Sequence, residues 1–166
     1  MKKKSILLGI LFITFTSTSI VAKNFIESDK SPIEIFIPST GEKAYAIAGE
    51  TFADMWEKVT GERPSVSYLE ADQKELSGSN VVLIGSDAVN PVVHEFMRTG
   101  LIDGLGLQFG GDNYRLLSLN KEGKKYLILA GGSGRSTIYA VYDFFRKQAG
   151  VEYFWDGDVI PPHESI

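Results

Sequence analysis

The sequence predicts a single α+β domain, in which a mixed β-sheet of about five strands carries a layer of two main helices. Five short apolar or β-branched runs predict the strands, and two long stretches with apolar residues at helical spacing predict the helices. One pair of strands is joined by a short turn that contains glycine, which is typical of an antiparallel hairpin. A chain of 166 residues suits one domain.

The first predicted unit is a strand followed by a long helix. Residues 33–37 alternate β-branched and other side chains, which predicts a strand. Ser39 and Glu42 have the spacing of a capping box, so we expect them to begin the helix. Apolar residues then recur at helical spacing over residues 44–59 and stop at Gly61.

The middle of the chain predicts two strands and a short helix. Residues 64–71 form a weaker strand candidate, whereas residues 81–84 are a continuous apolar run typical of a strand buried on both faces. Pro91 can begin a short helix over residues 92–98. The glycine-rich residues 101–111 are expected to be irregular.

The last part predicts a hairpin, the second long helix and a final strand. Two strands, residues 114–119 and 124–130, flank a turn that places Gly123 where φ must be positive. A helix should cover residues 135–149, and residues 151–155 should form a short strand. The helix should face the sheet with Ile138, Val141, Tyr142 and Phe145.

The N-terminus has the pattern of a secretory signal. Three lysines at positions 2–4 precede an apolar run over residues 6–15, and small residues lead to a cleavage site after Ala22. The apolar run is short for a membrane span, which needs ~20 residues. A buried N-terminal helix or an uncleaved anchor is the alternative. We expect residues 1–22 to be removed, residues 23–32 to be a linker, and no transmembrane anchor to remain.

Charge and cysteine content narrow the function classes. Cleavage would change the net charge from −4 to −7, because the leader has three lysines and no acidic residue. An acidic domain without a basic cluster is not expected to bind nucleic acid. A chain without cysteine has no disulfide, thiolate metal site or thiol nucleophile. We expect an exported bacterial protein of the periplasm, the cell surface or the extracellular space.

The turn from Gly131 to Thr137 (GGSGRST) resembles a phosphate-binding loop but departs from both known patterns. A Walker A loop needs glycine where Leu129 stands and lysine where Arg135 stands. A dinucleotide fingerprint has a third glycine where Thr137 stands, and opens the first unit of a longer fold. A structural turn is the simpler prediction, in which Gly131, Gly132 and Gly134 supply positive φ and Ser133 or Ser136 caps the helix. An anion or nucleotide held at this turn with the help of Arg135 stays an alternative.

Other chemistry is sparse, so we expect no catalytic residue, metal ion or cofactor in this chain. His94 and His163 are the two histidines, and no set of ligands has zinc spacing. Asp156, Asp158 and Glu164 could serve as paired carboxylates, but a solvated loop is the simpler prediction. Seven aromatic residues could form a sugar-stacking platform, although their spacing predicts that most belong to the core. They are Tyr139, Tyr142, Phe144, Phe145, Tyr153, Phe154 and Trp155. Tyr153 and Trp155 are weak candidates for ligand binding, as is Arg135.

Residues 129–145 (LAGGSGRSTIYAVYDFF), followed by Gly150-Val151 and by Tyr153-Phe154-Trp155, resemble the N-terminal accessory domain of large exported glycoside hydrolases. These enzymes include bacterial α-glucuronidases, α-N-acetylglucosaminidases and β-hexosaminidases. The resemblance implies an α+β accessory domain over residues 33–155, packed beside a catalytic barrel that supplies the catalytic carboxylates. Ser136 departs from the family's pattern, which has glycine there.

The resemblance also implies that residues 156–166 are a connector toward a barrel outside this chain, which would make the chain a fragment. The expected function is therefore that of a non-catalytic N-terminal domain of a secreted glycoside hydrolase, with the downstream barrel as its partner. A stand-alone exported carbohydrate-binding module, with a glycan as partner, is the second hypothesis. An anion or nucleotide binder at the glycine turn is the third.

Overall fold

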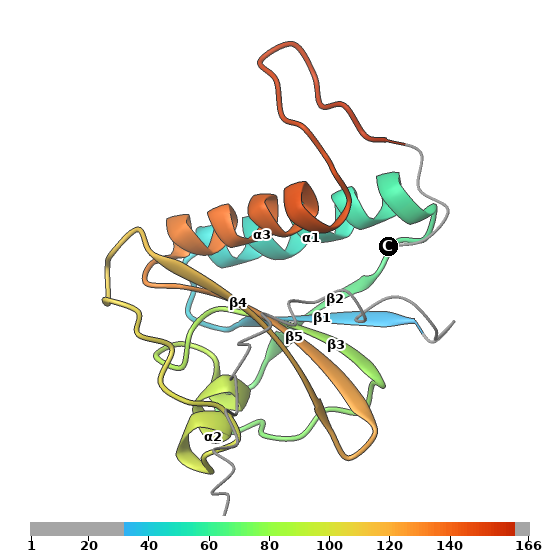
Figure 1. Cartoon of the computed structure of the whole chain (residues 1–166). Helices are drawn as coiled ribbons and strands as arrows, with labels where there is room; N and C mark the ends of the chain where they lie inside the picture. Colours follow the sequence, from blue (N-terminus) through green and yellow to red (C-terminus); the bar gives the residue numbers. More distant parts are fainter. Residues whose placement is uncertain (1–31, 162–166) are drawn as a thin grey trace, which may run out of the picture.

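A computed structural model describes residues 32–161 of the chain, and its architecture is a five-stranded mixed sheet with three helices (Figure 1). The strand order is β2-β1-β3-β5-β4, with β4 alone antiparallel to its neighbour. The elements along the chain are β1 Ile33–Pro38, α1 Lys43–Thr60, β2 Ser65–Leu69, β3 Asn80–Ile84, α2 Pro91–Arg98, β4 Tyr114–Lys121, β5 Lys124–Gly131 and α3 Gly134–Gln148. The predicted fold class, a single α+β domain, is confirmed. The predicted leader (1–22), nearly all of the linker (23–32) and the last five residues of the predicted connector lie outside the described residues.

The two long helices cover one face of the sheet, and α2 covers the other (Figure 1). Helices α1 and α3 pack over the strands in one apolar cluster that centres on Phe52, Phe144 and Phe145. A second cluster joins α2 and the loop after it to the opposite face through Phe96 and Leu105. The sequence predicted one helical layer, whereas the sheet is covered on both sides. The second cover explains why β3 is buried along its whole length, as its continuous apolar run predicted.

Helix α1 begins differently from the prediction. Its N-cap residue is Glu42, and no side chain caps it. The Ser39 hydroxyl instead donates a hydrogen bond to the carbonyl oxygen of Leu69, at 2.5 Å, and so ties the end of β1 to the end of β2. The capping-box prediction was therefore wrong, because a tertiary contact takes the serine side chain. The predicted helix end is confirmed, since Gly61 has a φ of 83°.

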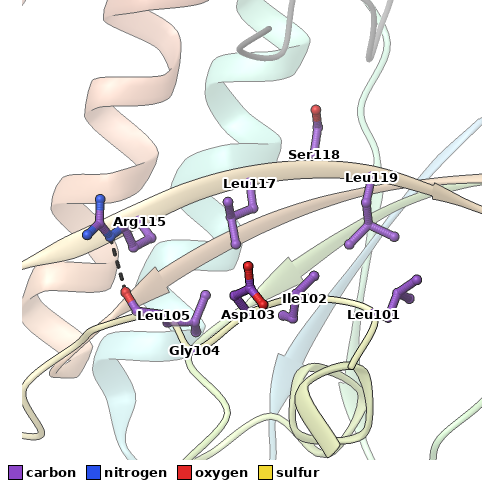
Figure 2. A pocket seen from close by; sticks show the side chains of 9 residues that line it. All are labelled: Leu101, Ile102, Asp103, Gly104, Leu105, Arg115, Leu117, Ser118 and Leu119. Carbon is purple, nitrogen blue, oxygen red and sulfur yellow. Dashed lines mark hydrogen bonds between the residues drawn. The ribbon is translucent and has the colours of Figure 1, made fainter. Parts of the chain in front are cut away.

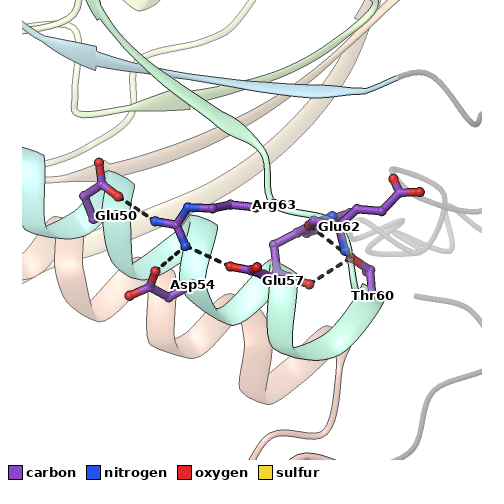
Figure 3. A network of polar contacts seen from close by, with 7 residues as sticks. Glu50, Asp54, Glu57, Thr60, Glu62 and Arg63 are labelled. Atoms are coloured by element: carbon purple, nitrogen blue, oxygen red, sulfur yellow. Dashed lines mark hydrogen bonds and ion pairs between the residues drawn. The ribbon is translucent and has the colours of Figure 1, made fainter.

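Arg63 links the segment between α1 and β2 to the exposed face of α1. Its guanidinium lies 2.8 Å from Glu50, 2.5 Å from Asp54 and 3.0 Å from Glu57, all three on one exposed face of α1 (Figure 3). These carboxylates would otherwise repel one another at helical spacing. The network therefore relieves a repulsion on α1 and holds the chain where it enters β2.

The predicted hairpin is confirmed, with longer strands than expected. Strands β4 and β5 pair from Tyr114 opposite Gly131 to Lys121 opposite Lys124. The loop consists of Glu122 and Gly123, whose φ values are 52° and 80°. Two successive residues with positive φ give the tight loop whose twist matches that of the flanking strands.

The expected final strand is absent. Residues 151–155 belong to a loop that runs from residue 150 to residue 160 and projects away from the domain beyond the end of α3 (Figure 1). An isolated bridge between Glu152 and Val159 joins its two arms. The prediction was wrong because the edges of the five-stranded sheet are formed by β2 and β4, and this segment pairs with neither.

Candidate functional site

The turn between β5 and α3 needs glycine for close packing, and not for its dihedral angles. None of Gly131, Gly132 and Gly134 has positive φ, so that part of the prediction was wrong. A Cβ atom on Gly131 would meet the Thr137 amide nitrogen and would lie 2.6 Å from the backbone carbon of Ser136. Any larger residue would push the first turn of α3 away from the strand.

At the other two glycines, the absence of a side chain lets neighbouring segments of the chain pack closely. A Cβ atom on Gly132 would meet the carbonyl oxygen of Gln108, in the loop before β4. One on Gly134 would meet Glu42 and would lie 2.6 Å from the Cβ atom of Ala44, at the start of α1. The turn is therefore wedged between two other parts of the chain, which leaves little open space at its backbone.

The start of α3 already has a complete cap. Ser133 is the N-cap residue, and its hydroxyl accepts a hydrogen bond from the Ser136 amide at 3.2 Å. The Ser136 hydroxyl accepts one from the Ser133 amide at 2.9 Å, and it also donates to the Gly111 carbonyl oxygen at 3.1 Å. The buried Ser136 thus both caps the helix and holds the preceding loop.

Arg135 points to a protein carboxylate. Its guanidinium lies 2.5 Å from Asp112, and this contact raises the pKa of the arginine further above its usual value. The Glu42 carboxylate also lies beside Gly134, where a bound anion would benefit from the helix N-terminus. Asp112 thus pairs with the Arg135 guanidinium, and Glu42 lies at the positive N-terminal end of α3. Both carboxylates would repel an anion bound at the turn.

The seven aromatic residues divide into core and surface. Phe144 and Phe145 are buried against Phe52 of α1. Tyr139 and Tyr142, in contrast, are exposed on α3. Phe154 and Trp155, which follow α3, are exposed as well. The expectation that most of the seven belong to the core was therefore wrong, because α3 turns only one side toward the sheet.

The projecting loop is anchored at its base by an aromatic pair. The ring of Tyr153 meets that of Tyr142 edge to face, with 4.8 Å between the centroids. The Tyr153 hydroxyl donates to the Tyr142 carbonyl oxygen at 3.3 Å. Burial, and secondarily the nearby Asp158 carboxylate, raise the pKa of Tyr153 above its usual value. Tyr153 thus holds the loop against α3.

Beyond this anchor the loop presents its aromatic side chains to solvent. Trp155 is 97% exposed and Phe154 is 52% exposed. Asp156 and Asp158 beside them are also exposed, as predicted for a solvated loop. Because the loop leaves the far end of α3, Trp155 and Arg135 lie at opposite ends of that helix and do not form one site (Figure 1).

A cavity of about 380 Å³ lies between β4 and the loop after α2 (Figure 2). Leu117 and Leu119 of β4 face Ile102 across it, and Arg115 donates to the Leu105 carbonyl oxygen at 3.1 Å. Its lining is mainly aliphatic, and we interpret it as loose packing under a loop.

Residues 32–161 contain no group of three histidine, cysteine or acidic side chains placed to hold a metal ion. His94 is exposed on α2, while His163 and Glu164 lie outside the described residues. Within the same range, no helix is long and apolar enough to cross a membrane.

Comparison with known proteins finds no match: no protein-family model and no curated protein sequence corresponds to this chain.

Proposed function

We propose that this chain is the non-catalytic N-terminal domain of a secreted glycoside hydrolase, and that the projecting loop docks on the catalytic barrel. The observation that carries the proposal is the exposure of Trp155, 97%, on a loop that is anchored to the domain and extends beyond it. The resemblance of residues 129–155 to the accessory domains of these enzymes supports the identity of the partner.

A large exposed aromatic side chain on an anchored loop suits an interface. Burying a tryptophan removes 150–250 Å² of surface from water, at roughly 25 cal/mol per Å². Tyr153 fixes the base of the loop, so little conformational freedom would be lost when Phe154 and Trp155 are covered. Aromatic residues of this kind frequently dominate the binding energy of interfaces.

The two tryptophans of the chain allow a direct test of docking. Trp56 is buried in the core, whereas Trp155 is exposed, so iodide should quench only the emission of Trp155. We expect this quenching in the full chain and its loss when the chain is produced in phase with the downstream barrel. Trp155→Phe, which leaves only Trp56, is the control. With the barrel attached, wild type and Trp155→Phe should be quenched equally, and a larger quenching of wild type would contradict docking through this loop.

The proposal also predicts that the chain by itself lacks glycosidase activity. The full chain should not turn over aryl glycosides, whereas the reading frame in phase after codon 166 should encode a barrel with two catalytic carboxylates. Turnover that stays with the purified chain, or a downstream frame without a barrel, would contradict the proposal.

A second candidate function is glycan binding by the same aromatic surface. Trp155 and Phe154 are exposed on the loop whose Tyr153 packs on Tyr142, and their rings provide flat apolar faces on which sugar rings can stack. Titration with soluble oligosaccharides should then shift the emission of Trp155 in the isolated chain. An unchanged spectrum in wild type would reject this candidate and leave docking as the function of the loop.

A further inference from the structure

A second hollow, of about 450 Å³, lies at the carboxyl ends of the parallel strands β1, β2 and β3. The segments that follow these strands supply its walls, through Ser39 and Thr40 after β1, Lys74 after β2, and Asp87 after β3. His94 of α2 completes the lining. The hollow is separate from the projecting loop, which leaves α3 over the opposite, amino ends of the strands (Figure 1).

The topology of the sheet creates this hollow. Strands β1 and β3 are adjacent and parallel, but β1 continues into α1 on one face and β3 continues into α2 on the other. The two connections separate in opposite directions and leave a crevice outside the strand ends. In open α/β sheets, ligands bind in the crevice at this kind of switch point.

The polar groups in the hollow include a carboxylate, Asp87, that has no partner among residues 32–161. Asp87 is half-buried, yet its side chain forms no hydrogen bond or ion pair with any residue of the described range 32–161. A carboxylate at such a position has two oxygens that can accept hydrogen bonds from a ligand. The imidazole of His94 likewise has no side-chain partner within this range.

The charges in the hollow are close to balanced. The Lys74 ammonium lies 3.5 Å from Glu95, so a protein carboxylate already pairs with it. The first amides of α2, at Val92 and Val93, both donate to the Asn90 side chain, at 3.0 and 3.2 Å. A phosphate would therefore find the helix amides occupied and Asp87 nearby. The lining itself carries one positive charge, on Lys74, and one negative charge, on Asp87, so it offers a cation no net attraction.

We propose that this hollow binds a neutral, hydroxyl-rich small molecule, such as a sugar unit. Two adjacent hydroxyl groups can donate to the two oxygens of Asp87, while His94 and the Thr40 hydroxyl supply further donors and acceptors. Leu69 and Val89 add an apolar wall for the carbon atoms of the ligand. This site does not depend on the proposed docking of the loop, because it uses none of the same residues.

The test is a titration of the ¹⁵N-labelled full chain with the methyl glycosides of xylose, glucose and mannose, followed by amide chemical shifts. Inorganic phosphate and ethylammonium are the charged comparison probes. We expect shifts for at least one glycoside, confined to residues 39–40, 69–74 and 86–94. Asp87→Asn should weaken binding by about tenfold, because the amide can accept through one oxygen only. His94→Ala, on an exposed face of α2, should weaken it independently.

Asp103→Asn, on the exposed loop after α2 and outside the lining of the hollow, is the matched control and should bind as wild type does. The absence of shifts with all three glycosides would overturn the proposal, as would stronger binding of phosphate or ethylammonium. Equal binding by wild type and Asp87→Asn would overturn it too. Shifts confined to residues 153–155 would reject this site and support glycan binding by the aromatic loop instead.

Discussion

The ammonium group of Lys147 lies 2.6 Å from the buried carboxylate of Asp143, one turn earlier on α3. The Arg146 guanidinium lies 2.6 Å from the other carboxylate oxygen, and Tyr114 of β4 hydrogen-bonds to the same side chain. Burial by itself would raise the pKa of Asp143, but the hydrogen bonds from Lys147 and Arg146 outweigh it and leave the pKa below its usual value. Asp143 therefore links the last turns of α3 to the edge strand.

The substitution Asp143→Asn should lower the free energy of unfolding by about 1 kcal/mol at neutral pH, because it removes charge-assisted hydrogen bonds. Because the folded pKa is depressed, this contribution is present above the unfolded pKa of about 3.9 and is lost as the pH falls below it. Urea denaturation at several pH values checks this. The difference between the two proteins should shrink below about pH 4, and a constant difference would contradict the assignment. Asp158→Asn, on the projecting loop, is the control.

The packing at the glycine turn gives a second prediction. Gly131→Ala should destabilise the protein by about 2 kcal/mol, because its Cβ atom would meet the backbone of Ser136 and Thr137. Gly104→Ala is the matched control, since a Cβ atom there meets nothing within 4 Å and the backbone φ is not positive. Thermal unfolding of both variants measures the effect. Similar midpoints for the two would show that the turn tolerates side chains.

The hydrogen-bonded cap of α3 gives a third prediction. Ser136→Gly should lower the free energy of unfolding by about 1–2 kcal/mol, because the Ser133 amide and the Gly111 carbonyl group lose a partner. Hydrogen exchange should become faster at residue 133 and in the loop around residue 111. Ser77→Gly, in an exposed loop, is the control. Unchanged exchange at residue 133 would contradict the reciprocal cap.

The buried and the exposed side of α3 give a fourth prediction. Phe145→Ala should destabilise the protein by about 3–5 kcal/mol, since this side chain is fully buried against Phe52. The sequence predicted that Tyr142 faces the sheet, where Tyr142→Asp would bury an unpaired charge at a cost of a few kcal/mol. Tyr142 is 39% exposed, so the charge stays hydrated and the cost should be about 1 kcal/mol. Chemical denaturation compares the two variants, and a loss for Tyr142→Asp as large as that for Phe145→Ala would refute this placement.

Local sequence patterns were sufficient to predict most of the fold. The continuous apolar run at residues 81–84 predicted a strand buried on both faces, and Gly61 predicted the end of α1. Gly123 predicted the hairpin turn in the same way. These features depend on side-chain periodicity and on backbone conformation within a few residues, which is information that the sequence carries directly.

The candidate sites depend on contacts between distant segments, which periodicity does not encode. Asp87 became a candidate only when the ends of β1, β2 and β3 were brought to one edge. The sequence did contain a weak signal for it, because a polar segment follows the buried strand β3. The lack of a side-chain partner for Asp87 among residues 32–161, however, is a property of the folded chain and of no local pattern.

The sequence by itself determined the order and type of the main elements, because helices and strands follow from local spacing and turn chemistry. The tertiary structure decided which surfaces remain for function. It placed α2 on the second face, used Gly131, Gly132 and Gly134 for close packing, and left Trp155 in solvent. The physical reason is that burial and close approach arise from residues far apart in the chain, whose contacts exist only once the sheet has assembled.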